Sequence, residues 1–454
     1  MKLLIIIVSF VLLISSCKKQ DWLNIKSNKS DVVPSSLKDL QALLDNERIM
    51  NSNTPGIGFV GTDNYYVTYA KWQAALNEQE RNAYIWAPEI YNGEFGYDWR
   101  YAYQKVEYSN IVLELIQQIP KDSSNSAVWN NVKGSALFFR ASSFNDLVQI
   151  YAKPYSSSTA DHDLGIPLRM TSDVNKKSVR ATVKETYERI LSDLLLAIDL
   201  LPLTPVYQTR PSKVAAWGLL AKVYLNMEDY EKAWQYANTA LFSYNSLLDF
   251  NTLSVPGLFS MPSYSSGNKE LIFYNNTLSF SISAFATMVD TTLYQSYDAN
   301  DLRKNIFYVN RSGGIVFRGS YTGSSPYFSG IATDELYLMR AECFARKNDP
   351  TAAMKDLNTL LAKRWKTGTF IPLTAVNADD ALKKILIERR KELPFSGNIR
   401  WEDLRRLNKD SRFSKTLIRV LNGITYTLPP GDIKYTYPIP PDEIALSGLE
   451  QNPR

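Results

Sequence analysis

The sequence predicts a mainly α-helical protein in which a scaffold of helical hairpins frames a loop-rich, partly β insertion. Two stretches support this prediction, residues 213–241 and 333–364. Both place apolar residues three or four positions apart, the spacing of one helix face, and both have a short polar turn in the middle. Between them, residues 242–332 lose the helical spacing and are rich in Tyr, Phe, Ser and Asn.

The two hairpins match each other position by position. Intervals of 3, 9 and 7 residues separate four packing positions in each copy, which are Ala221, Tyr224, Ala233 and Ala240 in the first copy and Ala341, Phe344, Ala353 and Leu360 in the second. Small residues facing each other let two helices approach closely, as in tetratricopeptide repeats. Asp349 is expected to cap a helix that begins at Pro350. The scaffold is therefore predicted to be tetratricopeptide-like.

In chain order, the first element is an export signal. Lys2 is followed by a run to Ile14 that is apolar except for Ser9, and then by Ser15-Ser16-Cys17, and this run is too short to span a membrane stably. The last four of these residues resemble a bacterial lipobox, in which the Cys becomes the acylated first residue. We predict a lipoprotein signal over residues 1–16, lipidation at Cys17 and a lipid-anchored protein outside the cytoplasm. A cleaved signal with an incidental Cys is the alternative.

The remaining elements follow from periodicity and turn signals. A short helix is expected at 35–46, a loop-rich aromatic segment at about 51–98, and helical hairpins at about 99–151, 181–241 and 333–408. The second loop-rich segment covers about 242–332, with short strands expected at Leu271–Tyr274 and Ile306–Val309. The prolines of 438–441 fix an extended path near the C-terminus.

Composition excludes several classes of function. The chain has 45% hydrophobic and 21% charged residues, as an ordinary globular protein does. Its 51 basic and 46 acidic residues are interspersed, so no nucleic-acid partner is predicted. Cys343 is expected to be a small buried hydrophobe. The lone His162 lies between two aspartates and is expected to be solvated, so no metal and no cofactor are predicted.

Three segments carry a resemblance to a known family. They are ELYLMRAECFARKND (Glu335–Asp349), ERRKELPFSGNIRWEDLRRLN (Glu388–Asn408) and YPIPPDEI (Tyr437–Ile444). With the order of the elements, they resemble the SusD/RagB family of Bacteroidetes outer-membrane lipoproteins over essentially the whole mature chain.

The resemblance implies one SusD-like domain over residues 17–454, exposed on the cell surface. The domain would act as a lid on a SusC-like TonB-dependent outer-membrane transporter and capture nutrients, usually oligosaccharides. It also implies structural roles for Arg389, Arg390, Trp401 and Arg405, with Glu388 and Glu392 as their ion partners.

Sugar recognition needs flat aromatic faces together with polar groups for the hydroxyls. The two loop-rich segments supply both, and the resemblance implies that they build the ligand site. The predicted ligand-binding residues are Asp63, Asn64, Tyr65, Tyr66, Trp72, Trp86, Tyr91, Asn92, Tyr294, Tyr297, Arg311, Tyr321 and Tyr327.

Two other functions are compatible with parts of the sequence. Peptide capture, as in members that resemble RagB, would use the same kind of polar, aromatic site. A glycoside hydrolase would need two carboxylates at a defined separation, and the acids near the aromatics are Asp63, Glu89, Glu94 and Asp98. Because no nucleophile elbow, metal-ligand cluster or phosphate loop accompanies them, we predict that the protein is not an enzyme.

Overall fold

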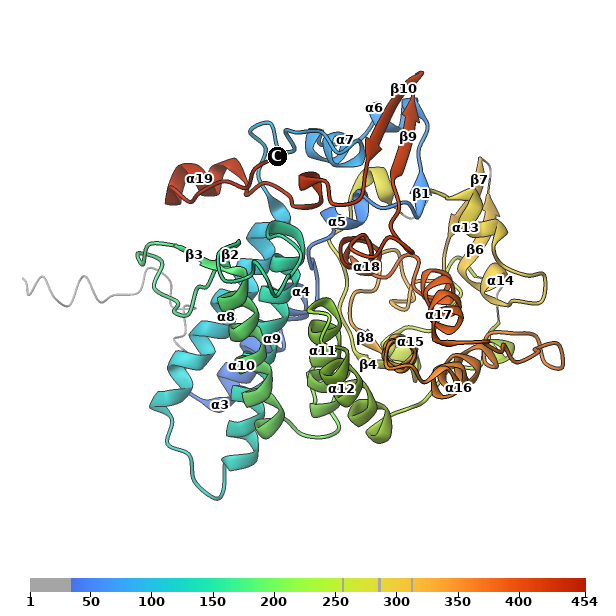
Figure 1. Cartoon of the computed structure of the whole chain (residues 1–454). Coiled ribbons are helices and arrows are strands. Elements are labelled where there is room, and N and C mark those ends of the chain that lie inside the picture. Colours follow the sequence, from blue (N-terminus) through green and yellow to red (C-terminus); the bar gives the residue numbers. More distant parts are fainter. Residues whose placement is uncertain (1–33, 255–256, 285–286, 312) are drawn as a thin grey trace, which may run out of the picture.

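The frame of the molecule consists of α-helices that pack on one another in chain order (Figure 1). The structure, a computed structural model, describes residues 34–254, 257–284, 287–311 and 313–454. The main helices are α3 (Leu37–Leu44), α8 (Tyr97–Leu115), α9 (Ser126–Tyr151), α10 (Val183–Leu200), α11 (Lys213–Asn226), α12 (Tyr230–Ser243), α15 (Thr333–Arg346), α16 (Pro350–Leu361), α17 (Ala378–Glu392) and α18 (Ile399–Leu407). The mainly α-helical fold class is confirmed. The export signal and Cys17 lie outside the described residues.

The two predicted repeats are hairpins of the frame. Helix α11 packs on α12, α15 packs on α16, and α12 packs on α15, which joins the two copies. The small residues Ala221, Ala233, Ala341 and Ala353 are fully buried at these contacts. The carboxylate of Asp349 accepts a hydrogen bond of 2.9 Å from the backbone N–H of Ala352 and caps α16. The repeat and its cap are as the spacing predicts.

The first loop-rich segment folds into short pieces that lie beside the C-terminal part of the chain. They are α4 (Glu47–Met50), α5 (Ile57–Val60), β1 (Tyr65–Tyr66), α6 (Tyr69–Gln73) and α7 (Glu78–Tyr84). Helix α5 packs against α18, whose Trp401 is fully buried. The segment is therefore anchored to the frame.

The insertion contains short strands and two short helices. Strand β4 (Leu271–Phe273) pairs with β8 (Ile331–Ala332), while β5 (Met288–Val289), β6 (Tyr308–Arg311) and β7 (Gly314–Phe317) join β1 in a sheet of order β1-β5-β7-β6. The helices are α13 (Thr291–Gln295) and α14 (Arg303–Phe307). The strand predicted at Ile306–Val309 is wrong in its first half, because Ile306 and Phe307 complete α14 and bury their side chains there.

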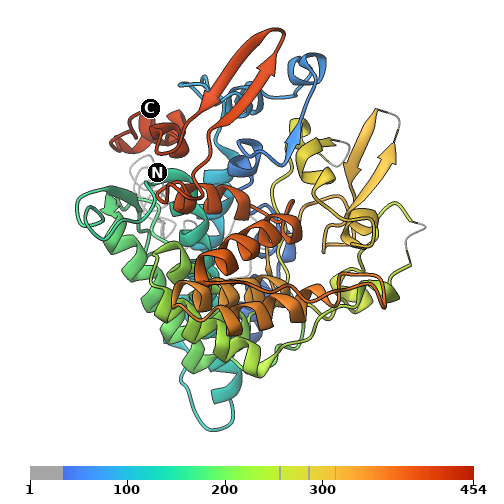
Figure 2. The same cartoon turned by 45° about the vertical axis from the view of Figure 1, so that its right-hand side comes forward.

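Two hairpins outside the helical frame were not predicted. Strands β9 (Leu417–Leu421) and β10 (Ile424–Leu428) project beyond the helices, as Figure 2 shows. Strands β2 (Leu164–Pro167) and β3 (Arg180–Thr182) pair in the link between α9 and α10. The last helix, α19 (Pro441–Ser447), begins at a proline in its first turn, where a missing N–H costs nothing.

Buried ion pairs tie the insertion to the frame. Arg303 of α14 is fully buried and binds Glu388 and Glu392 of α17 at 2.5 and 2.9 Å. Arg364, after α16, also binds Glu392, at 2.6 Å. The expected pairing of these two glutamates with Arg389, Arg390 and Arg405 is therefore wrong. The carboxylates instead neutralise arginines from distant segments of the chain.

Candidate ligand-binding site

The two segments predicted to build the ligand site meet in the four-stranded sheet. Strand β1 pairs antiparallel with β5, with Tyr65 opposite Val289 and Tyr66 opposite Met288. The backbone N–H of Asp290 donates a hydrogen bond of 2.9 Å to the carbonyl oxygen of Asn64. Residues more than 220 positions apart thus share one ladder, and side chains of both segments border the same surface.

An aromatic face lies beside this ladder and consists of Tyr66, Tyr69 and Trp72. Tyr66 and Tyr69 are 40% and 37% exposed, and Trp72 is half-buried. The rings of Tyr69 and Trp72 stack at 5.7 Å with an angle of 23° between their planes. The Trp72 indole N–H donates to the carbonyl oxygen of Arg81, which fixes the ring. The face therefore presents pre-oriented aromatic surface with polar rims.

Tyr69 was not among the predicted ligand residues. The sequence feature that points to Tyr69 is its position three residues before Trp72, because this spacing places both rings on one side of a short helix. The hydroxyl of Thr68 accepts from the backbone N–H of Lys71 and begins α6 at this point.

Two further predicted residues lie on the insertion side of the sheet. Tyr294 on α13 is half-buried, and the Lys304 ammonium is 5.2 Å from its ring centroid. Its ring also meets that of Tyr308 edge-on at 5.7 Å. Arg311 ends β6 and is half-buried at the opposite edge of the sheet from β1. Asn92 is exposed, but its amide lies away from this sheet and donates a hydrogen bond of 2.9 Å to the Glu78 carboxylate at the start of α7.

Asp63 is held by three cations. Its carboxylate lies 2.7 Å from Arg400, 3.2 Å from Arg390 and 2.8 Å from Lys415. Burial would raise the pKa of this carboxyl, but the charges of Arg400, Arg390 and Lys415 hold it well below its usual value. Arg390 also lies 3.6 Å from Asp290. Three cations thus face two carboxylates beside the sheet, and Asp63 positions basic groups there.

Seven predicted ligand residues are buried, and we reassign them to packing. Their side chains form hydrogen bonds with other groups inside the protein. The Tyr65 hydroxyl donates to Val60, the Trp86 indole to Gly61, the Tyr297 hydroxyl to Lys391 and the Tyr327 hydroxyl to Ser283, in each case to a backbone carbonyl. The Asn64 amide donates to the carbonyl oxygen of Pro394, and the hydroxyls of Tyr91 and Tyr151 bond to each other. The Tyr321 hydroxyl bonds to two carboxylates. Rings buried in this way offer no face to a ligand.

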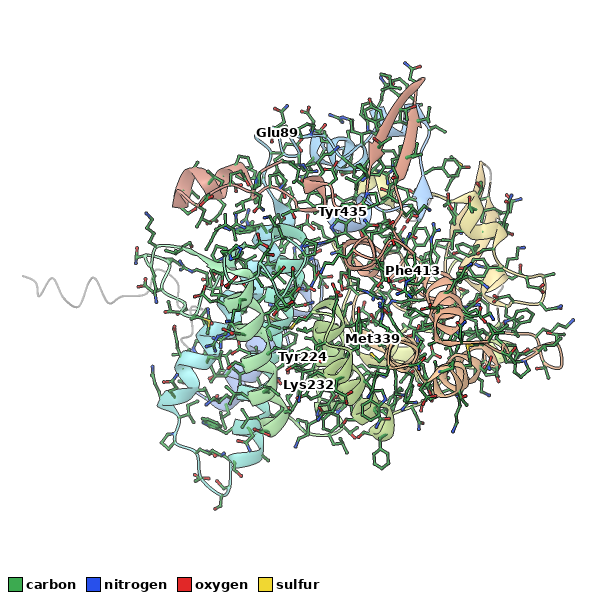
Figure 3. The ribbon with its side chains drawn as sticks, in the orientation of Figure 1. Glu89, Tyr224, Lys232, Met339, Phe413 and Tyr435 are labelled. Carbon is green, nitrogen blue, oxygen red and sulfur yellow. The ribbon has the colours of Figure 1, made fainter. Side chains whose placement is uncertain are left out.

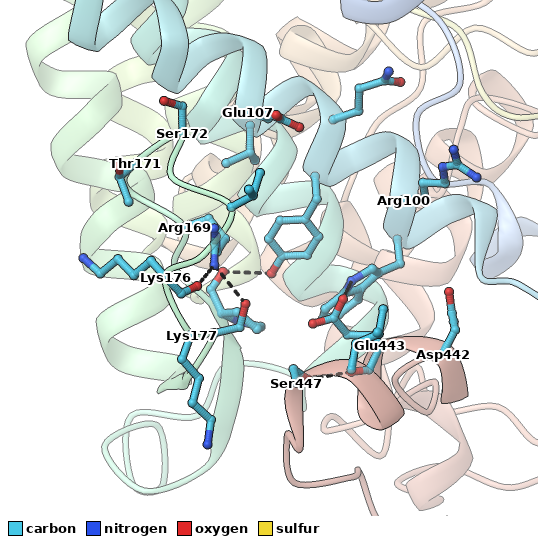
Figure 4. Close-up of a pocket in the computed structure, with 18 of the residues that line it drawn as sticks. Arg100, Glu107, Arg169, Thr171, Ser172, Lys176, Lys177, Asp442, Glu443 and Ser447 are labelled. Atoms are coloured by element: carbon cyan, nitrogen blue, oxygen red, sulfur yellow. Dashed lines mark hydrogen bonds between the residues drawn. The ribbon is translucent and has the colours of Figure 1, made fainter. Parts of the chain in front are cut away.

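A groove that the sequence analysis missed lies between α8, the link before β3, and α19 (Figure 4). Its volume is about 960 Å³. Tyr103 donates to the carbonyl oxygen of Pro167 at 2.8 Å, and the Trp99 indole donates to Glu443 at 3.3 Å. The side chains of Arg169 and Lys176 come from the link. The link consists of turns, and hydrophobic periodicity does not predict how such turns fold. The groove is large enough for a small ligand.

The carboxylates considered for glycosidase chemistry have structural partners. Asp98 is fully buried and accepts from the backbone N–H groups of Gly56 and Ile57, and burial raises its pKa to about 6. Glu94 accepts from the N–H groups at the start of α7, and Asp63 binds the three cations. Glu89 lies at the edge of the molecule (Figure 3). These four acids do not form a facing pair of free carboxylates.

The described residues contain no group of three or more His, Cys, Asp and Glu side chains that could hold a metal ion. His162 is exposed and lies 2.7 Å from Asp161. Among the helices of residues 34–454 that the structure describes, none is long and apolar enough to cross a membrane.

Comparisons with known proteins agree along the chain. A family model described as "starch-binding associating with outer membrane" matches residues 21–225, and the SusD family model matches residues 272–454. SusD-like protein P2 of Formosa agariphila is 25% identical over 383 residues, which is 70% of this chain and 72% of that protein.

Solved structures share the fold. A SusD superfamily protein from Bacteroides thetaiotaomicron has a TM-score of 0.71 and 23% identity, covering 92% of this chain and 100% of that one. A SusD-like carbohydrate binding protein from Bacteroides vulgatus has a TM-score of 0.65 and 19% identity, covering 91% and 97%.

Proposed function

Because the chain belongs to the SusD family, we propose that it is a surface glycan-binding lipoprotein that captures oligosaccharides for import. The observation that carries this proposal is the aromatic face of Tyr66, Tyr69 and Trp72, beside the ladder between β1 and β5. Pyranose rings pack their C–H surfaces against such faces, and nearby polar side chains bind the hydroxyls. Catalysis is not part of the proposal.

The insertion and the C-terminal part of the chain supply further aromatic and cationic groups beside the proposed site. Tyr294 can extend the aromatic surface, and Arg390 and Lys415 remain partly exposed beside Asp63. Together with Arg400 they face two carboxylates, Asp63 and Asp290, which neutralise most of the positive charge, so the surface suits a polyhydroxylated chain better than a strong anion.

The experiment is isothermal titration of the full chain with a panel of oligosaccharides and peptides. For the glycan that binds, Trp72→Ala and Tyr69→Ala should each weaken affinity about tenfold or more, equivalent to about 1.4 kcal/mol. Phe242→Ala is the matched control, because Phe242 is 90% exposed on α12, away from the sheet. Unchanged affinity in both test variants would refute the site. If only peptides bind, the ligand of the protein is a peptide and not a glycan.

Anchoring and delivery are proposed on the same basis. Acylation of Cys17 would hold the protein at the outer membrane, where a SusC-like TonB-dependent transporter would receive the glycan. Cys17→Ser should move the protein from the membrane fraction to the soluble fraction. Recovery of an outer-membrane barrel protein with the wild-type chain from detergent extracts would support the partner, and its absence would count against it.

A further inference from the structure

The β9–β10 hairpin directs an arginine into the first loop-rich segment. Along β9, the exposed side chains of Ile418 and Val420 alternate with the buried side chains of Leu417, Arg419 and Leu421. The hairpin lies beside α6 and α7 (Figure 1), and Arg419 is only 8% exposed. One face of the hairpin is therefore at the surface, while the other face carries a cation into the protein.

Arg419 is enclosed by three aromatic rings. Its guanidinium carbon lies 3.5 Å from the ring centroid of Tyr84, 4.6 Å from that of Trp86 and 5.6 Å from that of Tyr65. All three distances are within the range of cation–π attraction, which is stronger when the cation is buried. Among the described residues no carboxylate lies within 4 Å of Arg419, so the rings and the backbone compensate its charge.

The guanidinium also binds the backbone that leads into β1. Its Nη2 donates to the carbonyl oxygens of Val60, at 3.1 Å, and of Thr62, and its Nη1 donates to the carbonyl oxygen of Tyr84. Val60 ends α5, and Thr62 lies three positions before β1. Arg419 therefore fixes the chain as it enters the strand.

The side chain of Tyr84 extends this contact to the other end of β1. Its hydroxyl accepts a hydrogen bond of 3.1 Å from the backbone N–H of Val67. Val67 lies between Tyr66, the last residue of β1, and Tyr69, the first residue of α6. Arg419 thus binds the backbone before the strand directly and the backbone after the strand through Tyr84.

Trp86 completes the set of three rings in a backbone conformation that bulky residues rarely adopt. Its φ is 54°, in the left-handed region, where the β-carbon comes too close to the backbone. Its indole N–H donates to the carbonyl oxygen of Gly61 at 2.9 Å, and its ring lies against Arg419. These two contacts hold the strained turn and add a further attachment to residues 60–62.

We propose that Arg419 is a positioning residue of the ligand site: it holds β1 and the chain that leads into α6, so that the aromatic face keeps its shape. It acts through the backbone and through Tyr84, and it does not touch the ligand. The identity of the face as a ligand site rests on the proposed function, whereas the contacts of Arg419 do not. Lysine is a poor substitute, because its compact ammonium has neither a flat face for the rings nor a planar fork for separate carbonyl oxygens.

Hydrogen–deuterium exchange of the full chain tests these contacts without any ligand. In Arg419→Lys and Arg419→Met, the amides of residues 60–72 should exchange at least tenfold faster than in the wild type, while those of α11 and α12 should keep their rates. Val420→Thr is the matched control and should change neither segment, because Val420 is the next residue of β9 and is 63% exposed. Equally faster exchange throughout the chain, or unchanged exchange at residues 60–72, would overturn the proposal.

Titration with the glycan that the wild type binds tests the effect on the site. Arg419→Lys should weaken the affinity at least tenfold at a temperature well below its unfolding transition. In a Trp72→Ala background the same substitution should weaken the affinity less than threefold, because the face that Arg419 positions has already lost a ring. An unchanged affinity, or an equal loss in both backgrounds, would contradict a role through the face. If the wild type binds no glycan, the proposed function fails, and the exchange rates alone decide whether Arg419 holds β1.

Tyr84→Phe tests the second attachment and decides the question if the Arg419 variants do not fold. It keeps the ring against Arg419 but removes the acceptor of the Val67 N–H. Exchange around Val67 should become at least tenfold faster, and glycan affinity should fall at least threefold. Unchanged exchange and affinity in this variant would refute the connection between Arg419 and the aromatic face.

Discussion

Replacing Tyr321 with Phe separates a packing role from a ligand-binding role at this position. The Tyr321 hydroxyl lies 2.6 Å from Oε2 of Glu270 and 3.0 Å from Oδ2 of Asp334, and the ring is 5% exposed. A hydroxyl has one proton, so it can donate to only one carboxylate. The second contact requires a proton on the other carboxyl group. Arg364 binds Glu270 at 2.9 Å, so the proton belongs on Asp334.

The magnitude follows from this hydrogen-bond chain. The Tyr321→Phe variant keeps the ring but removes the donor to a charged, fully buried Glu270. A hydrogen bond to a charged group contributes about 1.5–3 kcal/mol, and an unsatisfied buried acceptor costs a similar amount. We therefore expect the free energy of unfolding to fall by about 2 kcal/mol. Stacking on a ligand would be unaffected, because Phe retains the aromatic face.

Urea unfolding at pH 7, followed by the fluorescence of the nine tryptophans, measures the change. Tyr207→Phe is the matched control, since Tyr207 is 61% exposed. An unfolding curve of Tyr321→Phe that overlays the wild type would refute the buried hydrogen-bond chain. A loss of glycan affinity without a loss of stability would return Tyr321 to the ligand site.

Three further predictions test other parts of the structure. Burial, together with the neighbouring Glu270 and Glu392, raises the pKa of Asp334 well above its usual value. The stability that depends on its proton is therefore lost as pH rises through the raised pKa. Asp334→Asn should unfold with a flatter pH dependence in urea titrations from pH 5 to 9, and an unchanged slope would contradict the protonated carboxyl. The variant Gly96→Ala would place its new Cβ against the ring of Pro440, and the free energy of unfolding should therefore fall by about 1–3 kcal/mol in the same assay. An unchanged free energy of unfolding would show that the tail can move away from residue 96. Cys343 is buried, and burial raises the pKa of its thiol. Iodoacetamide should therefore leave it unmodified until urea unfolds the chain, as measured by mass spectrometry. Labelling of Cys343 in the native state would contradict its buried position.

The helical frame could be predicted because each helix has local signals. Apolar spacing marks one face, and caps such as Asp349 mark the ends, so the hairpins are placed to within a few residues. The β9–β10 hairpin also has a local sequence signal, which the prediction of elements above did not include. Asn422-Gly423 lies between two alternating runs, and both residues adopt positive φ, 49° and 79°.

The site was predictable by segment but not by side chain. Adjacent Tyr65 and Tyr66 differ only in which face of β1 they occupy, and one is 3% exposed while the other is 40% exposed. That difference depends on a partner strand more than 220 positions away. The partners of Glu388 and Glu392 also come from other segments, since Arg303 is 85 positions from Glu388 and Arg364 is 28 positions from Glu392. Single-sequence periodicity contains no information on such pairings.

The pairing of β1 with β5 has a consequence for the ancestry of the gene. The strands belong to regions on opposite sides of residues 226–271, a stretch that neither family model matches. A crossover after α12, within residues 244–271, would exchange whole helical hairpins between two relatives, yet it would join the aromatic face of one relative to the insertion of the other. Such chimaeras should fold and lose their preferred cargo. New preferences are therefore expected to arise by paired substitutions within one lineage rather than by shuffling.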